Sequence, residues 1–317
     1  MISVIIPTYK RPIELERAIK SALAQVDVAF EILVVNDCKE DTGVKALIDK
    51  LNDKRIIYLD NERTKGGNGS RNTAIGYSKG GYLAFLDDDD EWYADKLKEQ
   101  LLSLNGLSNE WGGAYCAFQV EVNDKWTDYT NLSDGNLFCD LLSGRAEINA
   151  GSTLFIKKSV VEDIGLFAED LVRHQDLEFL ARFFAKYKIA VANKVLAKIY
   201  GHNITKNINS IEQNKLIFLE KIKEHIHRLP VTLQNRIYAY QFRELAVLFA
   251  MNGDNKKALH YLKKSISYGF MFPTRYISVF LYAWKNSTGI DMMQILNKVK
   301  YYLRNNKLTS KILKNIS

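Results

Sequence analysis

The sequence predicts an α/β protein in which helices flank a mostly parallel sheet and an all-helical C-terminal region follows. In the first ninety residues, short β-branched runs alternate with segments whose apolar residues recur at helical spacing. Beyond Asn209 the spacing is almost wholly helical. Strands and helices that alternate in this way favour right-handed crossovers between parallel strands.

The first strand is expected over residues 3–7, which are apolar, largely β-branched and end at a proline. A helix should follow, because its apolar residues fall on one helical face. The next expected elements are, in order, a strand over 30–35, a helix capped by Asp41, a strand over 55–59, a glycine-rich loop over 66–69, a helix over 71–77 and a strand over 82–86.

The rest of the chain divides into a mixed part and a helical part. In the mixed part we expect strands over 114–122 and 152–157 and a helix over 176–187. Residues 245–262 predict a helical hairpin that resembles a single tetratricopeptide-like unit, and one unit is not an array, so we interpret it as helix packing. The expected division is a domain over residues 1–205 and a basic helical region over 206–317.

Composition excludes several protein classes. The 317 residues are 47% hydrophobic and 26% charged, which is ordinary for a globular protein and unlike a disordered or fibrous one. Apolar runs are too short to span a bilayer, and the N-terminus lacks a secretory signal pattern. Cys38, Cys116 and Cys139 are scattered, which predicts neither a disulfide framework nor a zinc cluster. We therefore expect a cytoplasmic protein.

The net charge of +7 is unevenly distributed. Residues 206–317 contain 19 Lys/Arg and 6 Asp/Glu, which leaves 25 and 31 for residues 1–205. This asymmetry suggests two regions with different partners. A basic region binds nucleic acid or anionic lipid, or is simply solvated, and charge alone leaves these alternatives open.

Polar residues gather where the predicted strands end. Open parallel sheets bind ligands at the carboxyl ends of their strands, where the loops diverge. We therefore predict one crevice lined by Pro7-Thr8-Tyr9, Asn36-Asp37, the glycine loop with Arg71-Asn72, and Asp87-Asp88-Asp89-Asp90.

The four consecutive aspartates are the most specific of these features. Adjacent carboxylates repel one another and resist burial unless a cation neutralises them. Oxygen ligands of this kind suit Mg²⁺ or Mn²⁺. The alternative is a solvated acidic loop in which Asp90 caps a following helix, but the position directly after an apolar strand favours the metal.

The other strand-end features are less specific. The glycine loop lacks the Lys-Ser/Thr of a P-loop and does not match a dinucleotide fingerprint, so it is either a ligand contact or a flexible turn. Asp37 could accept a hydrogen bond from a nucleotide base or ribose, or could cap the next helix. Tyr9 could stack on a base or simply lie on the surface.

Taken together, residues 1–205 resemble the family 2 glycosyltransferases, which have the GT-A nucleotide-sugar fold. The order and spacing of the matching segments make the resemblance specific. The segments are Val4-Ile-Ile-Pro-Thr-Tyr9, Ile32-Leu-Val-Val-Asn-Asp37, Gly69-x-Arg71-Asn72, Phe85-Leu-Asp-Asp-Asp-Asp-Glu-Trp92, Gly151-Ser-x-Leu-Phe155, Ile164-Gly-Leu-Phe167 and His174-Gln-Asp-Leu-Glu-Phe-x-x-Arg182.

The resemblance implies an inverting hexosyltransferase that moves a sugar from a nucleotide-sugar, usually a UDP-sugar, to an acceptor hydroxyl. Asp176 would be the general base. Thr8 and Tyr9 would hold the nucleotide base, with Asp37 at its edge, and Arg71 would lie near the diphosphate or the ribose. The full implied donor-binding set is Pro7, Thr8, Tyr9, Arg11, Asp37, Gly69, Arg71, Asp87 and Asp88, and the implied metal set is Asp89, Asp87 and His202.

This chemistry needs a base on the acceptor and charge stabilisation on the leaving diphosphate. Mn²⁺ or Mg²⁺ would supply the second as a Lewis acid. An aspartate with the ordinary pKa of about 3.9 is a poor base, so desolvation should raise the pKa of Asp176. Asp176 could also cap its helix, which is compatible with catalysis, whereas a lone histidine such as His202 is more often structural.

Three residues depart from the family pattern. Asn36 replaces the commoner acidic residue beside Asp37, and Cys38 replaces the usual glycine. Gln175 replaces the acidic neighbour of the base. The first two bear on the choice of nucleotide and the third on acceptor orientation or the pKa of the base.

The basic C-terminal region suggests where the acceptor lies. Cationic amphipathic helices favour an anionic bilayer surface. We therefore expect a glycan or lipid-diphosphate-linked acceptor, such as a growing bacterial surface polysaccharide of the O-antigen or capsule type. The protein would then be peripheral at the inner face of the cytoplasmic membrane.

Other classes of protein fit the sequence less well. A non-catalytic nucleotide-binding or scaffold protein would be expected to have lost Asp89 or Asp176, and both are present. A nucleic-acid binder would interleave aromatic residues with Lys/Arg, whereas Tyr301 and Tyr302 suggest helix packing, so we expect no nucleic-acid partner. A sugar nucleotidyltransferase is rejected because residues 7–12 contain no glycine.

Overall fold

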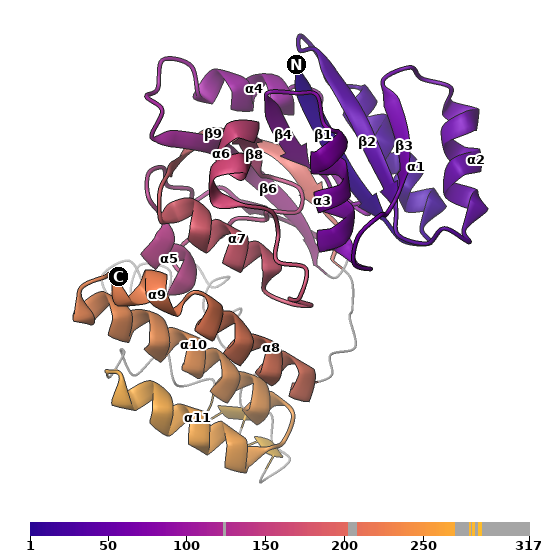
Figure 1. Cartoon of the computed structure of the whole chain (residues 1–317). Helices are drawn as coiled ribbons and strands as arrows, with labels where there is room; N and C mark the ends of the chain where they lie inside the picture. Colours follow the sequence, from indigo (N-terminus) through magenta and orange to yellow (C-terminus); the bar gives the residue numbers. More distant parts are fainter. Residues whose placement is uncertain (123–124, 202–207, 270–278, 280, 283–284, 287–317) are drawn as a thin grey trace, which may run out of the picture. The chain divides into compact units, whose positions relative to one another are not determined.

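The computed structural model describes residues 1–122, 125–201, 208–269, 279, 281–282 and 285–286 (Figure 1). The chain folds as two compact units, Met1–Arg228 and Leu229–Ser317. This division falls later than the boundary expected after residue 205, because α8 (Ile208–Lys221) and α9 (Lys223–His227) belong to the first unit. The rings of Phe218 and His174 lie 5.3 Å apart and join α8 to the first unit.

The described strands of the first unit form one nine-stranded sheet in the order β3-β2-β1-β4-β8-β6-β9-β5, with β7 paired to β6. The strands β1 to β4 pair in parallel. The other half is mixed, because β8 is antiparallel to β4 and β6 whereas β9 is parallel to β6. The strands are β1 (Ile2–Thr8), β2 (Phe30–Asn36), β3 (Ile56–Asp60), β4 (Tyr82–Phe85), β5 (Glu91–Trp92), β6 (Trp111–Val122), β7 (Lys125–Tyr129), β8 (Phe155–Lys157) and β9 (Lys188–Ile199).

Helices cover both faces of this sheet (Figure 1). On one face, Val4 and Ile6 of β1 share a core with the apolar sides of α1, α2 and α4. On the other face, Phe85 packs edge-on against Phe167, which stacks on Phe179 of α7. The helices before α8 are α1 (Pro12–Leu23), α2 (Thr42–Leu51), α3 (Gly67–Tyr77), α4 (Lys96–Ser103), α5 (Phe138–Leu142), α6 (Lys158–Ile164) and α7 (Gln175–Phe184). The expected α/β class, with helices flanking the sheet, is confirmed.

The parallel half places its carboxyl ends at one edge of the sheet. β1 and β2 run in register from Ile2 opposite Phe30 to Thr8 opposite Asn36. The backbone N–H of Asp37 then donates to the Thr8 carbonyl at 2.9 Å. The polar residues predicted to follow these strands therefore lie at the same edge of the sheet.

Several elements differ from the sequence-based expectation, and three of these differences have a local explanation. The glycine-rich segment forms the first turn of α3, which begins at Gly67. β8 is shorter than the strand expected over 152–157, because the N–H groups of Ser152 and Thr153 donate to Asn149 and close a turn. β9 was not predicted, since exposed residues near Lys194 interrupt its apolar alternation.

The second unit contains the predicted helical hairpin, formed by α10 (Val231–Met251) and α11 (Asn255–Ser267). Gly253 has φ 84 at the turn, a conformation that glycine adopts without strain. The Asp254 side chain caps α11 by accepting from the N–H of Lys257 at 2.9 Å. The basic stretch over residues 292–316 lies outside the described residues.

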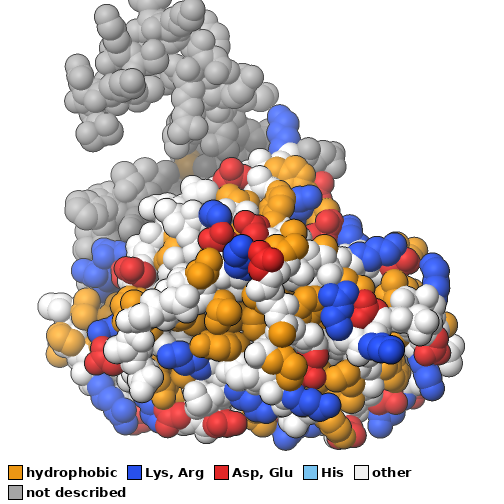
Figure 2. All heavy atoms as spheres, turned by 90° about the horizontal axis from the view of Figure 1, so that it is seen from above, with side chains coloured by type: hydrophobic (Ala, Val, Ile, Leu, Met, Phe, Trp, Pro, Cys, Tyr) orange, Lys and Arg blue, Asp and Glu red, His pale blue; other side chains and the backbone are white. Residues whose placement is uncertain are grey.

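Two properties of the surface bear on partners. None of the described helices combines the length and the apolar character needed to cross a bilayer. On the face shown in Figure 2, Lys/Arg and Asp/Glu side chains are interspersed. The described side chains on that face therefore form no single patch of one sign of charge.

Candidate functional site

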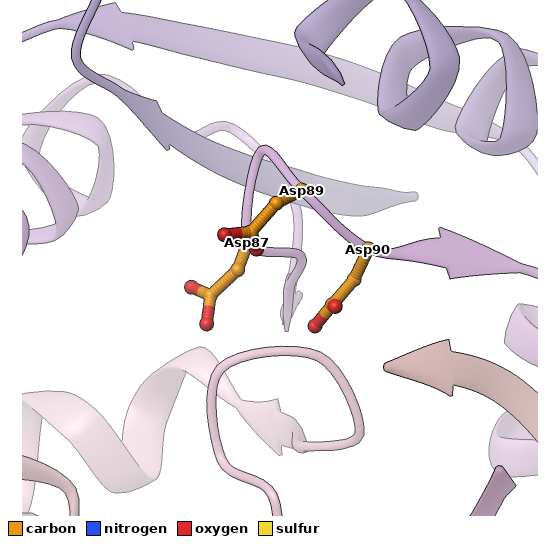
Figure 3. A group of neighbouring side chains, drawn as sticks. All are labelled: Asp87, Asp89 and Asp90. Atoms are coloured by element: carbon orange, nitrogen blue, oxygen red, sulfur yellow. The ribbon is translucent and has the colours of Figure 1, made fainter. Parts of the chain in front are cut away.

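The site is built around the acidic turn, defined as Asp87–Asp90 between β4 and β5. The carboxylates of Asp87, Asp89 and Asp90 point to the same side of the turn (Figure 3). One oxygen from each lies within 4.8 Å of the others. Asp90 precedes β5, and α4 begins only at Lys96, so Asp90 does not cap a helix.

Residues far away in the sequence hold this turn in place. The Ser152 hydroxyl accepts from the N–H of Asp87 at 3.1 Å and donates to the carboxylate of Asp90. The N–H of Tyr200 donates to the same carboxylate at 3.0 Å. A Cβ on Gly151 would lie 2.0 Å from Asp87 Oδ2, so only glycine allows the backbone to approach this carboxylate.

The charges of the turn fit a divalent cation. Burial, and then the neighbouring charge of Asp87, raises the pKa of Asp90 to about 8, although the hydrogen bonds from Ser152 and Tyr200 oppose the rise. The ionised form of Asp90 therefore lacks a compensating charge among the described residues, and a bound cation would supply one. Three hard oxygen donors within this distance are suitable ligands for Mg²⁺ or Mn²⁺.

Asp88 has different contacts from the other three aspartates. Its carboxylate accepts from the Thr8 hydroxyl at 2.8 Å and from the N–H of Tyr9 at 3.4 Å. The Arg11 guanidinium lies 3.5 Å from Asp88 and 2.5 Å from Asp89. Asp88 thus ties the acidic turn to the end of β1, which brings four of the predicted donor-binding residues together.

Arg71 links the acidic turn to Asp176, the predicted general base. It lies on α3, is almost fully buried, and donates from Nη2 to Asp87 Oδ1 at 2.6 Å. Burial raises the pKa of the Asp176 carboxyl, the positive charge of Arg71 lowers it, and the negative charge of Asp87 raises it. Three predicted residues from α3, the acidic turn and α7 therefore lie close enough for their charges to interact.

The start of α7 presents polar atoms that lack partners. Asp176 Oδ1, Gln175 Oε1 and His174 Nε2 are all buried, and none has a hydrogen-bond partner among the described residues. Buried polar groups without partners are rare in native proteins and require an explanation. A substrate hydroxyl that meets Asp176 would be one.

The predicted nucleotide end is formed by Asp37 and Tyr9. Asp37 accepts from the Asn61 amide at 2.6 Å and from the N–H of Gly66 at 2.8 Å. The Tyr9 side chain is 42% exposed, and Lys65 Nζ lies 4.9 Å from the centre of its ring. A carboxylate has about four lone-pair positions, so Asp37 can still accept a hydrogen bond from a nucleotide base.

The remaining predicted residues are placed as follows. Pro7 lies within β1 opposite Val35. Gly69 packs on the preceding backbone, because a Cβ there would lie 1.8 Å from the Thr64 carbonyl oxygen. His202 lies outside the described residues. The contacts of Pro7 and Gly69 with a donor stay predictions.

One departure from the family pattern has a structural explanation. The amide of the buried Asn36 donates to the Cys38 carbonyl at 2.8 Å and to the Asp41 carbonyl at 3.1 Å. Its oxygen accepts from the N–H of Cys38 at 3.1 Å. An ionised acid has no donor for the two carbonyls, so Asn36 shapes the turn that presents Asp37.

Sequence reasoning missed several residues that complete the site. Asp90 was expected only as part of the acidic run and not as a metal ligand, and Ser152 was not assigned a role. Asn72 was noted only as part of a motif, yet it donates to the Phe167 carbonyl at 2.9 Å and to Glu169 at 2.8 Å. The signal for Asn72 was its place beside Arg71 in the motif, whereas no pattern indicated Glu169.

Known proteins resemble this chain in sequence and in fold. A family model described as "Glycosyl transferase family 2" matches residues 3–165. An uncharacterized glycosyltransferase of Rickettsia prowazekii is 30% identical over 263 residues, which cover 80% of this chain and 81% of that protein. The Escherichia coli protein named "UDP-Glc:alpha-D-GlcNAc-diphosphoundecaprenol beta-1,3-glucosyltransferase WfgD" is 39% identical over 125 residues, which cover 39% of this chain and 48% of that protein.

Among solved structures, the Staphylococcus aureus TarS fragment 1–349 in complex with UDP-GlcNAc is similar, with a TM-score of 0.62. The match covers 88% of this chain and 83% of that one at 16% identity. At this identity the likeness shows the fold alone, and it agrees with the expected GT-A type.

Proposed function

The chain belongs to glycosyl transferase family 2 and is a glycosyltransferase, and from this premise we propose that it moves a sugar from a UDP-sugar to an acceptor hydroxyl with inversion at the anomeric carbon. The acceptor would be a lipid-diphosphate-linked sugar or a growing surface polysaccharide of the O-antigen or capsule type. The observation that carries the proposal is the buried Asp176 Oδ1, which has no hydrogen-bond partner in the described part of the chain and whose carboxyl lies close enough to Arg71 and Asp87 for their charges to shift its pKa.

Asp176 would act as the general base. An acceptor hydroxyl that reaches its free oxygen gives up its proton while the hydroxyl oxygen attacks the anomeric carbon. Burial raises the pKa of the carboxyl and makes the carboxylate a stronger base, while the nearby positive charge of Arg71 opposes the rise. Attack from the side opposite the leaving diphosphate is a single displacement and therefore inverts the anomeric centre.

The acidic turn would hold the metal ion that stabilises the leaving diphosphate. Asp87, Asp89 and Asp90 would hold Mg²⁺ or Mn²⁺, which when bound stabilises negative charge on a departing diphosphate. Arg71 fixes the direction of the Asp87 carboxylate. His202, which the family resemblance implies as a further ligand, remains part of this proposal.

The donor and acceptor are argued from the nucleotide end and from the relatives. Asp37 and the exposed ring of Tyr9 suit the edge and face of a base. WfgD is named for the donor UDP-Glc and for a diphosphoundecaprenol-linked acceptor, and the TarS structure is a complex with UDP-GlcNAc. The basic region over residues 206–317 would favour peripheral binding to an anionic membrane where such lipids reside.

The test is a transfer assay on the full chain with Mn²⁺. UDP-glucose, UDP-galactose, UDP-GlcNAc and GDP-mannose are each offered with a synthetic GlcNAc-diphosphoundecaprenol acceptor, and the anomeric configuration of the product is read by NMR. We expect transfer from one of the UDP-sugars with inverted configuration. Product of retained configuration, or transfer from GDP-mannose alone, would contradict the proposal. Nucleotide binding without any transfer would instead support the non-catalytic scaffold.

A further inference from the structure

We infer that Glu169 is a positioning residue for Asp176: its carboxylate fastens the segment that leads into α7 onto α3 and onto Arg63 and Thr64 just before it. The same helix, α3, also holds Asp87 through Arg71. The inference rests on the proposed function, because Asp176 is a base only if the chain transfers a sugar. Glu169 itself touches neither the acidic turn nor Asp176 in any contact of the described residues.

The segment in question, residues 165–174, joins α6 to α7. It begins with φ 87 at Gly165 and ends with φ 61 at His174. A left-handed conformation costs a residue with a side chain about 1 kcal/mol, and it persists only where the surroundings hold it. His174 directly precedes α7, so its conformation sets the direction in which the helix presents Asp176.

Two asparagines on one side of α3 hold this segment. Asn68 donates to the carbonyls of Ala168 at 2.7 Å and of Leu171 at 3.0 Å. Asn72, one turn further on, donates to the Phe167 carbonyl at 2.9 Å and accepts from the Phe167 N–H at 3.0 Å. The backbone of the segment is thus bonded to α3 at three residues, Phe167, Ala168 and Leu171.

Glu169 completes the attachment with a side chain that lies on the segment itself. Its carboxylate accepts from the Asn72 amide at 2.8 Å, from Arg63 Nη1 at 3.0 Å and from the N–H of Thr64 at 3.2 Å. Burial opposes ionisation, but these hydrogen bonds lower the pKa of Glu169 to about 2. Hydrogen bonds to an ionised acceptor are stronger than neutral ones, so the bonds that Glu169 accepts are the strongest of the attachment.

α3 therefore controls both halves of the site. Between Asn68 and Asn72, Arg71 reaches Asp87 at 2.6 Å. On the segment, the Phe167 ring stacks on Phe179 of α7 with the centroids 4.1 Å apart. A shift of the segment relative to α3 would move α7, and with it Asp176, away from Asp87. A misplacement of about 1 Å can cost about 100-fold in rate.

The neighbouring Asp170 provides a matched control. It carries the same charge in the same segment, but it pairs with Lys221 of α8 at 2.8 Å instead of with α3. We would compare Glu169→Ala, Glu169→Gln and Asp170→Ala in the full chain. The measurements are kcat for transfer, the Kd for UDP with Mn²⁺, the ratio of transfer to hydrolysis of the donor by water, and amide hydrogen exchange over residues 166–178.

We expect Glu169→Ala to lower kcat by about 10- to 100-fold, to shift the ratio toward hydrolysis and to speed exchange at the start of α7, with an unchanged Kd for UDP. Glu169→Gln keeps the shape and an acceptor oxygen, so it should recover part of the rate. Asp170→Ala should behave as wild type.

Unchanged kcat in Glu169→Ala would overturn the inference, and so would equal losses in Glu169→Ala and Asp170→Ala. If the wild type transfers no sugar, the proposed function fails, and the exchange measurement still decides about Glu169. Equal exchange in Glu169→Ala and Asp170→Ala would then overturn the attachment itself.

Discussion

Arg71 Nη2 lies 2.6 Å from Asp87 Oδ1, and this ion pair joins α3 to the acidic turn. The Arg71 side chain is 8% exposed, whereas that of Asp87 is 36% exposed. A charge as buried as Arg71 requires partners, and Asp87 and Asp176 are the first two whose charges raise its pKa against the effect of burial. The pair therefore serves both the stability of the domain and the direction of the Asp87 carboxylate.

Replacing Arg71 by methionine should lower the free energy of unfolding by roughly 3 kcal/mol, the low end for a buried pair because Asp87 is partly exposed. For a domain of this size, that is a fall in Tm of several degrees. Arg55→Met is the control, since Arg55 forms a pair at 2.8 Å with Asp53 but is 42% exposed. The free energy of unfolding of Arg55→Met should fall by no more than about 1 kcal/mol. Equal changes in Tm would contradict this account of Arg71.

Gly69→Ala should destabilise the first unit by about 1–3 kcal/mol, because the new Cβ would meet the Thr64 carbonyl oxygen at 1.8 Å. Gly76→Ala in the same helix has open space around its Cβ and should be neutral or stabilising by up to about 1 kcal/mol. Urea unfolding of the two variants gives the comparison. A Gly69→Ala variant as stable as Gly76→Ala would show that α3 does not pack on Thr64 in this way.

Ser152→Ala should weaken the affinity for Mn²⁺ by about 10- to 100-fold, as expected when a side chain that orients metal ligands is lost. The Ser152 hydroxyl bonds both Asp87 and Asp90, whereas the Ser103 hydroxyl bonds the Gln100 carbonyl in its own helix. Isothermal titration with Mn²⁺ in the presence of UDP would measure the effect. Ser103→Ala should bind as wild type, and an equal loss in both variants would contradict the prediction.

Lys96 should make stability depend on pH in the alkaline range. Burial lowers its pKa from 10.5 to about 8, so the unfolded chain binds the proton more tightly than the folded one. Stability then rises with pH between about 8 and 10.5. Relative to Lys96→Met, the wild type should gain about 2 kcal/mol between pH 7.5 and pH 9.5 in urea unfolding. A constant difference between the two proteins would show that Lys96 keeps its ordinary pKa.

The fold was largely predictable because its signals are local. β1, β2 and α2 follow from runs of β-branched residues, from helical periodicity and from the cap that Asp41 provides to Gly43. The first turn of α3 was missed because glycines usually indicate a loop. Here Gly69 is needed for a close approach to Thr64, a contact that no local pattern reveals.

The site was predictable only where a motif lies at a strand end. The acidic run over residues 87–90 was recognised in this way, whereas Asp87 and Asp89 as metal ligands and Asp176 as the general base came from the family resemblance and stay predictions. The role of Asp90 depends on Ser152, which is 62 residues away, and that of Glu169 depends on Asn72, which is 97 residues away. Hydrogen bonds across such separations are set by the tertiary fold, so the sequence pattern does not contain them.

The central claim is that Asp176 deprotonates the acceptor beside the Arg71–Asp87 pair. The most direct test is the transfer rate of Asp176→Asn, measured together with the thermal stabilisation that UDP and Mn²⁺ give to the same variant. We predict that kcat falls by about 10²- to 10⁴-fold while the stabilisation by UDP and Mn²⁺ is unchanged. Transfer at the wild-type rate by Asp176→Asn would contradict the claim.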